Sequence, residues 1–191
     1  WVNHEGIKRE VRYRVPNKNQ CKECHSSNDV ISPIGPKARN LDKHLVYVDG
    51  SKNQLDYLLQ KGVIESIPKS FQTVSDWEDE SQSLEDRARA YLAINCGHCH
   101  RPSGVANSTG LYLDFNEVRP LHLGINKSPV ATGRGSGSLK YSIVPGEADK
   151  SILLYRMIST DPGVMMPESG RSLVHTEAVS LVEQWINSME N

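Results

Sequence analysis

The cysteines, and the histidines that follow them, are the residues whose spacing most clearly indicates chemistry. The chain has four cysteines, and all of them fall in two copies of one pattern, Cys21-Lys22-Glu23-Cys24-His25 and Cys96-Gly97-His98-Cys99-His100. Two thiols three positions apart, followed at once by an imidazole, can attach haem covalently, bind a metal ion or form a disulfide. No cysteine is left over, so a single chemistry should account for both copies.

Covalent haem attachment uses every residue of this pattern. The two thiols add across the vinyl groups of haem, and the adjacent imidazole becomes the proximal ligand of the iron. The sequence therefore predicts two covalently attached haem c groups. The predicted attachment residues are Cys21, Cys24 and His25 for haem 1, and Cys96, Cys99 and His100 for haem 2.

Other chemistries explain fewer of these residues. Zinc ribbons usually separate their two Cys-x-x-Cys pairs by ~15–20 residues, whereas residues 25–95 lie between the pairs of this chain. A thioredoxin-type redox motif would explain one pair at most and needs a βαβ context that the sequence does not indicate. Disulfides, like the redox motif, leave the following histidines without a role.

The composition excludes some functions and agrees with a haem protein. The net charge is −1, from 22 basic and 23 acidic residues without a long run of either sign, so nucleic-acid binding is not expected. No apolar run approaches the ~20 residues that a membrane span needs. Only two Phe and three Trp are available for the core, and the haem groups would supply apolar surface in their place.

Several secondary-structure elements can be predicted from periodicity and capping residues. We expect a short helix over Gln54–Lys61, capped by Ser51 or Asn53 and stopped by Gly62. A second helix, starting at a Ser83–Asp86 capping box, leads into the second haem motif.

The C-terminal part is expected to contain two more helices and a short strand. Asp149 would cap one helix, which ends near Ile158, and the last helix would bury Val179, Leu181, Val182, Trp185 and Ile186. Alternating Leu111, Leu113 and Phe115 predict the strand.

From Ala88 to its end the chain resembles a class I cytochrome c. The shared features are a helix entering Cys-x-x-Cys-His, a long loop, a helix, a Met-Pro pair and a C-terminal helix. The resemblance implies that Met166, which precedes Pro167, is the distal ligand of haem 2; Met165 is the alternative, and Met157 is expected to fill the core.

The first half resembles the same family more weakly and in shortened form. Gly35-Pro36 is similar to a family segment whose proline carbonyl orients the proximal imidazole, here His25. Ile67-Pro68 stands where Met-Pro is expected, and isoleucine cannot bind iron. The distal position of haem 1 is therefore assigned first to His44 and then to His4, with an open site or a ligand from the second half as the remaining alternatives.

Two further histidines are not expected to bind iron. His98 lies between two cysteines of one motif and cannot reach the iron of that motif, so we expect it at the surface or beside the ligands. His175 precedes the last helix and is expected to cap or pack against it.

The predicted fold is mainly α and cytochrome c-like, with two haem-binding halves that share a central helix and with minor short strands. Residues 1–82 would form the divergent half with haem 1, and residues 83–191 the class I-like half with haem 2. The whole resembles compact two-haem modules of bacterial redox proteins.

The resemblance implies an electron-transfer protein rather than an enzyme, with electrons passing from haem 1 to haem 2. The alternative is a di-haem peroxidase-like enzyme with an open distal site on haem 1. The expected partners are a donor and an acceptor protein, with a dehydrogenase or a polysaccharide-active oxidase as candidates. Haem c is assembled outside the cytoplasm, so we expect the bacterial periplasm or cell surface, and a signal peptide or larger portion upstream of Trp1.

Overall fold

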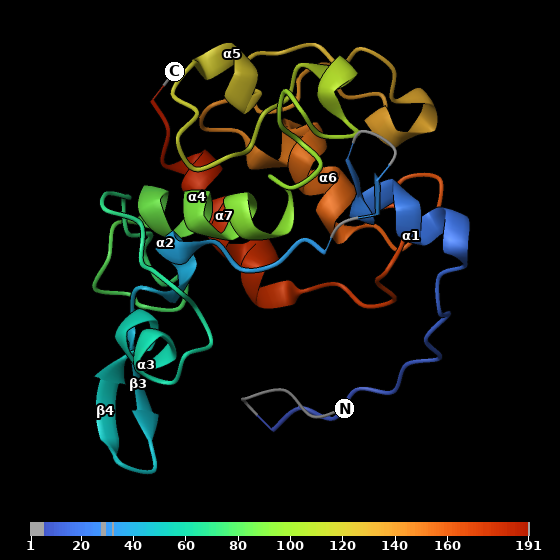
Figure 1. The fold of residues 1–191 in the computed structure, drawn as a ribbon. Coiled ribbons are helices and arrows are strands. Elements are labelled where there is room, and N and C mark those ends of the chain that lie inside the picture. The colour runs from blue at the N-terminus through green and yellow to red at the C-terminus, as the bar shows by residue number, and fades with distance from the viewer. Residues whose placement is uncertain (1–5, 28–29, 32, 191) are drawn as a thin grey trace.

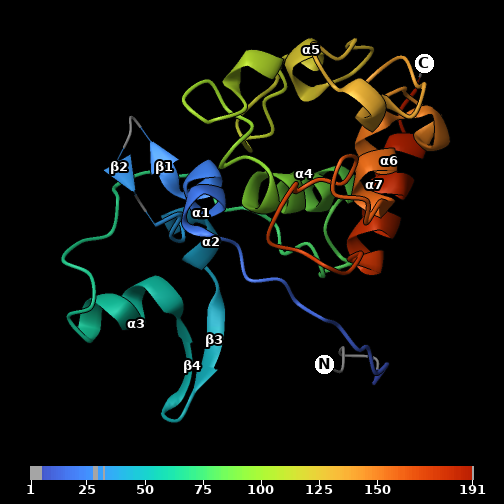
Figure 2. The ribbon, with the colours of Figure 1, turned by 90° about the vertical axis from the view of Figure 1, so that its right-hand side faces the viewer.

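Helices make up most of the regular structure, and two small hairpins supply the strands (Figures 1 and 2). The computed structural model describes residues 6–27, 30–31 and 33–190. The helices are α1 (Lys18–His25), α2 (Ala38–Leu41), α3 (Gln54–Gln60), α4 (Leu84–Asn95), α5 (Pro120–Leu123), α6 (Ile152–Ile158) and α7 (Thr176–Asn187). Three 3₁₀ turns, Asn107–Thr109, Gly133–Ser136 and Ala148–Lys150, join them. The prediction of a mainly α chain with minor strands is confirmed.

The two hairpins are both antiparallel. In the first, β1 (Ser26–Ser27) pairs with β2 (Val30–Ile31), directly after the first haem motif. In the second, β3 (His44–Tyr47) pairs with β4 (Gly50–Asn53), and His44 faces Asn53 across the ladder. This second hairpin, together with α3, extends away from the rest of the molecule (Figures 1 and 2).

The hydrophobic core lies between α4 and α7, which pack against each other with α6 alongside (Figure 2). The sequence periodicity is the reason, because each helix carries one apolar stripe. Leu92 of α4 and Val182 and Ile186 of α7 are almost completely buried. Met157 packs against this core, as expected from its position on α6.

Helix starts follow the predicted capping residues closely in two cases. The Asn53 side chain accepts hydrogen bonds from the backbone N–H groups of Leu55 and Asp56 at the start of α3. Ser83 accepts from the N–H of Asp86 at 3.1 Å, and its hydroxyl also bonds the Asp86 carboxylate, so α4 begins where the sequence indicated. Of the two candidate caps for α3, Asn53 is therefore the correct one.

The predicted cap for α6 is wrong. Asp149 lies in a 3₁₀ turn, and the helix starts after Ser151, whose side chain makes no capping bond. The buried Ser151 hydroxyl instead accepts from the N–H of Val144 at 2.9 Å. Ser151 is thus bonded to the preceding turn, and the helix starts beyond the capping signal.

The predicted strand at Leu111–Phe115 is also wrong. The N–H of Tyr112 donates to the His122 carbonyl at 2.7 Å, and that of Leu113 donates to the His100 carbonyl at 2.8 Å. These backbone groups bond α5 and the turn of the second motif instead of one neighbouring strand. The buried Leu113 therefore comes from loop packing.

The two predicted halves are connected by ion pairs as well as by the chain. Lys37 and Arg39 approach the Asp114 carboxylate at 2.8 and 3.0 Å. These contacts hold α2 beside the long loop that follows the second haem motif.

None of the helices in the described ranges is both long and apolar enough to cross a membrane.

Candidate functional site

The second haem motif lies directly at the end of α4. Cys96 caps the helix, and its N–H donates to the Leu92 carbonyl at 2.8 Å. The N–H groups of Cys99 and His100 then donate to the Cys96 carbonyl at 3.1 and 2.9 Å. The motif is therefore a tight turn that a buried helix holds in place.

The environment of this motif is apolar. Burial raises the pKa of Cys96 to about 12. Burial also raises the pKa of Cys99 to about 11, and the neighbouring Cys24 thiol adds to this shift. Both thiols are thus strongly disfavoured as thiolates.

His100 points into the protein, and its Nδ1 is buried. No hydrogen-bond partner for this atom lies within the described ranges. Burial is the main cause of a lowered pKa of His100. A neutral imidazole with an unoccupied nitrogen is the form in which histidine binds a metal.

The first haem motif lies on α1 and is more exposed. Asn17 and Gln20 form a reciprocal capping box at the start of this helix, so its start is well defined. Cys21 and His25 are exposed, and Cys24 is half-buried. The helix presents the motif to the second half of the chain.

The fold brings the two motifs together. The ligand atoms of Cys24, His98 and Cys99 all lie within 4.8 Å of one another. One residue of this group comes from the first motif and two come from the second, although residues 25–95 separate them in the sequence. The structure therefore joins the two predicted haem sites at one place.

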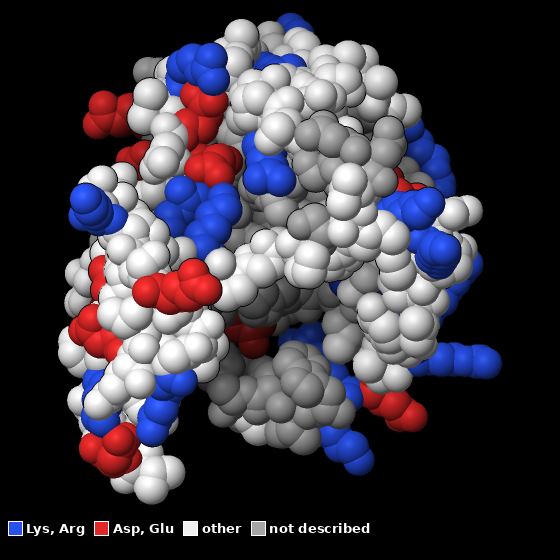
Figure 3. Space-filling view, in the orientation of Figure 1, with Lys and Arg blue, Asp and Glu red and all other residues white. Residues whose placement is uncertain are grey.

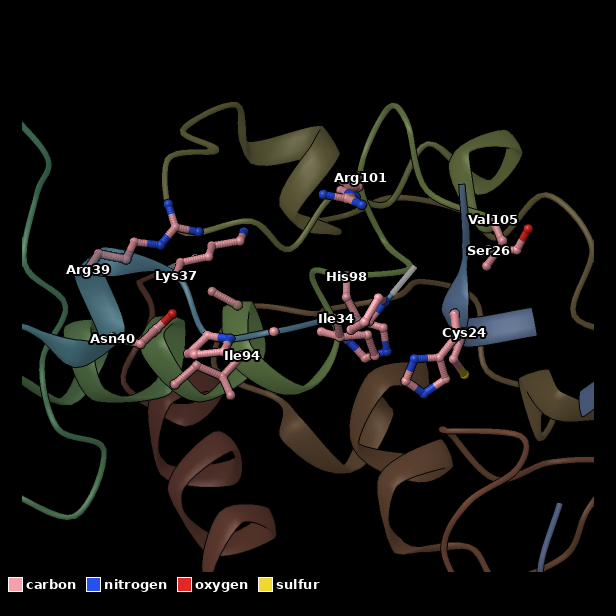
Figure 4. A pocket seen from close by; sticks show the side chains of 15 residues that line it. Cys24, Ser26, Ile34, Lys37, Arg39, Asn40, Ile94, His98, Arg101 and Val105 are labelled. Carbon is pink, nitrogen blue, oxygen red and sulfur yellow. The ribbon is translucent and has the colours of Figure 1, made fainter. Parts of the chain in front are cut away.

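A pocket of about 250 Å³ lies beside this junction (Figure 4). It is lined from the first half by residues that include Cys24, His25, Gly35 and Pro36, and from the second half by Ala93, Ile94, His98, Arg101 and Val105. The Gly35-Pro36 segment thus lies on the same pocket as His25. The pocket is smaller than the ~300–1,000 Å³ of most ligand sites, so a group as large as haem could be only partly enclosed here.

The Met165-Met166 segment is bonded to the end of α6, and its neighbours Arg156 and Glu168 act electrostatically on the second motif. The N–H of Met166 donates to the Arg156 carbonyl at 3.0 Å. Arg156 acts electrostatically on His100, and Glu168 acts on Cys99. Met165 is 7% exposed and Met166 is half-buried, so both remain available for the distal position.

The structure does not bring His44 to the pocket. His44 is exposed at the start of β3, in the hairpin that extends away from the molecule, and it is absent from the pocket lining (Figure 1). His4, the second candidate, lies outside the described residues.

His175 has the packing role that was expected. Its Nδ1 lies 3.2 Å from the Tyr91 hydroxyl, and its ring packs edge-on against Trp77 at 5.2 Å. Burial raises the pKa of Tyr91 to about 12, which keeps this hydroxyl protonated.

The sequence did not indicate two residues of the site, and it placed a third, His98, only at the surface or beside the ligands. Arg156 and Glu168, 3.7 Å apart, frame the second motif, and His98 lines the pocket of the first motif. Only His98 had a signal in the sequence, namely an additional histidine inside a Cys-x-x-Cys pair.

No protein-family model, curated protein or solved structure matches this chain. The class of site is therefore defined by the residues themselves: two Cys-x-x-Cys-His units that meet on a mainly helical scaffold.

Proposed function

We propose that the chain is a two-haem c-type cytochrome that transfers electrons between redox partners. The observation that supports this most directly is the meeting of the two motifs, with the Cys24 and Cys99 ligand atoms within 4.8 Å. A thioether sulfur is bonded directly to the haem periphery. Two haems attached at these sulfurs would be close to each other, which would favour electron exchange between them.

The residues of the second motif fit a haem. Cys96 and Cys99 would form the thioethers, and His100 would be the proximal ligand through a neutral imidazole. A thioether carries no charge, so the burial that disfavours a thiolate at Cys96 does not oppose attachment. We retain Met166 as the distal ligand, with Met165 as the alternative.

The residues of the first motif fit a second haem. Cys21 and Cys24 would form the thioethers, and His25 would be the proximal ligand. Gly35-Pro36 lies on the same pocket as His25, which agrees with a role in orienting that imidazole. The bound haem supplies a one-electron redox centre in each half.

The cytochrome c-like division of the fold belongs to the same proposal. Residues 83–191 would form the class I-like half and residues 1–82 a shortened, divergent half, with α4 shared between them. Ala93 and Ile94 of α4 line the pocket of the first motif, which supports a shared helix.

Electrons would pass from haem 1 to haem 2 if haem 1 has two histidine ligands, because methionine ligation raises the potential of haem 2. The donor and acceptor would be proteins of the bacterial periplasm or cell surface. Acidic and basic side chains are intermixed over the face shown in Figure 3, so this face presents no surface of a single charge to a partner.

Zinc binding is the second candidate, because Cys24, His98 and Cys99 form a compact group of possible ligands. This group uses one cysteine from each motif. It leaves Cys21, Cys96 and both proximal histidines without a role, whereas haem attachment uses all of them. Haem is therefore the better explanation.

The test is the mass and colour of the chain after export through a cytochrome c maturation system. We expect a red protein whose haem survives acid-acetone extraction and whose mass exceeds that of the polypeptide by ~1.2 kDa, two covalent haems. A colourless chain that binds one zinc per molecule would instead support the second candidate.

A further inference from the structure

His98 lines the pocket beside the first motif. Its Nδ1 is buried and has no well-aligned hydrogen-bond partner in the part of the chain that the structure describes, although the ring also interacts with the Ile94 backbone. Buried polar atoms are almost always paired. An imidazole that lines a pocket and makes so few hydrogen bonds is suited to bind a ligand there.

The turn of the second motif directs the side chain of His98 away from the side on which His100 lies. The N–H groups of Cys99 and His100 both donate to the Cys96 carbonyl, so this segment is wound like a helical turn. Successive residues of such a turn are ~100° apart, and His98 and His100 therefore point to nearly opposite sides.

The side that His98 faces is the site of the first motif. His98 and His25 line the same pocket, and a ligand nitrogen of His98 lies within 4.8 Å of the Cys24 sulfur (Figure 4). His98 is thus close to an attachment point of haem 1, although it belongs to the motif of haem 2.

The other described histidines are engaged elsewhere. His44 is exposed on β3. His122 lies against Tyr112 and 3.4 Å from the Glu117 carboxylate. His175 lies 3.2 Å from the Tyr91 hydroxyl. Apart from His25 itself, His98 is the one histidine of the described ranges that lines the pocket.

We propose that His98 is the distal iron ligand of haem 1, so that the first and second halves of the chain each contribute one imidazole. The proposal rests on the proposed function, because it needs a haem at the first motif. The proposal also explains why the first half can lack the Met-Pro pair. Ile67 stands where a methionine ligand is expected, and His98 of the second motif would supply the ligand instead.

This ligand would also connect the two redox centres. His98 is followed directly by Cys99, the attachment point of haem 2. The iron of haem 1 would then be joined to the periphery of haem 2 through two consecutive residues. A short bonded route of this kind suits rapid exchange of electrons between the haems.

The test uses the exported chain with both haems attached and compares wild type, His98→Ala and the matched control His44→Ala. We expect wild type to be fully low-spin by electron paramagnetic resonance and, when reduced, to bind no carbon monoxide at haem 1. His98→Ala should keep both haems by mass, convert one haem to high spin and bind one carbon monoxide per chain. Added imidazole should restore the low-spin signal, and His44→Ala should behave like wild type.

The outcomes separate the two proposals. A wild-type mass without two haems contradicts the proposed function itself. Two haems with an unchanged low-spin spectrum in His98→Ala overturn only the ligand assignment, as does a wild-type haem 1 that is already high-spin. Conversion by His44→Ala instead of His98→Ala would assign the ligand to the hairpin. Retention of the Met-to-iron charge-transfer band in His98→Ala shows that haem 2 is undisturbed.

Discussion

At the scale of single residues, two neighbouring methionines compete for one position. Met165 is buried, at 7% exposed, whereas Met166 is half-buried and precedes Pro167. A thioether that binds iron must leave the apolar packing of its neighbours and face the proximal His100. The two are adjacent in the sequence, so substitution has to separate them.

We expect Met166→Ala to abolish the Met-to-iron charge-transfer absorption of the oxidised protein and to lower the potential of one haem only, because Met ligation raises that potential. Met165→Ala is the matched control: it should keep the absorption and reduce stability by about 2–5 kcal/mol, as for other buried Met→Ala changes. Visible spectra, redox titration and thermal unfolding measure these effects. The reverse pattern would assign the ligand to Met165.

The attachment residues remain a prediction that comes from the sequence alone, because their spacing carries the chemistry. Cys21, Cys24 and His25 lie on one helix, and no tertiary contact is needed to define the motif. The neighbours of His98 could not be predicted in this way. The local turn sets the direction of His98, but its proximity to Cys24 depends on the packing of α1 against the turn after α4, which joins residues far apart in the sequence.

At the scale of elements, capping residues and apolar periodicity correctly predicted those helices whose position depends on local interactions. The Asn53 and Ser83 caps and the apolar stripe of α7 gave the correct helices. The signals at Asp149 and at Leu111–Phe115 were misleading. Ser151 bonds the N–H of Val144 in the preceding turn, and the backbone of Tyr112 and Leu113 bonds His122 and His100 instead of a neighbouring strand.

The turn before α5 provides a pH-dependent test of such loop interactions. The Glu117 carboxylate accepts from the Arg119 guanidinium at 2.8 and 2.6 Å, and from the backbone N–H groups of Val118 and Arg119. The hydrogen bonds from Arg119, chiefly that of its side chain, lower the pKa of Glu117 from 4.5 to about 2. A depressed carboxyl pKa stabilises the fold above the unfolded-state pKa, and this contribution disappears as pH falls through the folded-state value.

We therefore expect Glu117→Gln to lower the thermal midpoint at pH 7. The difference from wild type should shrink between pH 4.5 and pH 2, because wild type then loses the same charge. Melting curves across this range measure the effect, and Glu183→Ala, an exposed change on α7, should show no such trend. A difference that stays constant down to pH 2 would mean that the charge of Glu117 contributes nothing.

At the scale of the whole molecule, the two motifs meet although they lie far apart in the sequence. No local sequence pattern predicts this contact. The ion pairs of Lys37 and Arg39 with Asp114 fix α2 against the second half, and the pocket forms across this contact. A resemblance to single-haem domains describes each half, but it does not say how the halves face each other. The arrangement has a consequence for the redox properties of the pair.

Two haems attached at Cys24 and Cys99 should affect each other's potential. An oxidised haem carries one more positive charge than a reduced one. At the separation of two haems attached to neighbouring sulfurs, this charge changes the free energy of reduction of the other haem by on the order of 1 kcal/mol at an effective dielectric constant of ~20. If haem 1 has the lower potential, it is oxidised while haem 2 titrates. Its positive charge then favours the reduced form of haem 2 and raises that potential.

Removing haem 1 should therefore lower the potential of haem 2. We expect the double variant Cys21→Ala/Cys24→Ala to keep one haem by mass, to retain the Met-to-iron charge-transfer absorption and to show a potential tens of millivolts below that of haem 2 in wild type. Redox titration of both proteins measures this shift, and circular dichroism confirms that the helices persist. An identical haem 2 potential in the two proteins would mean that the haems do not interact electrostatically.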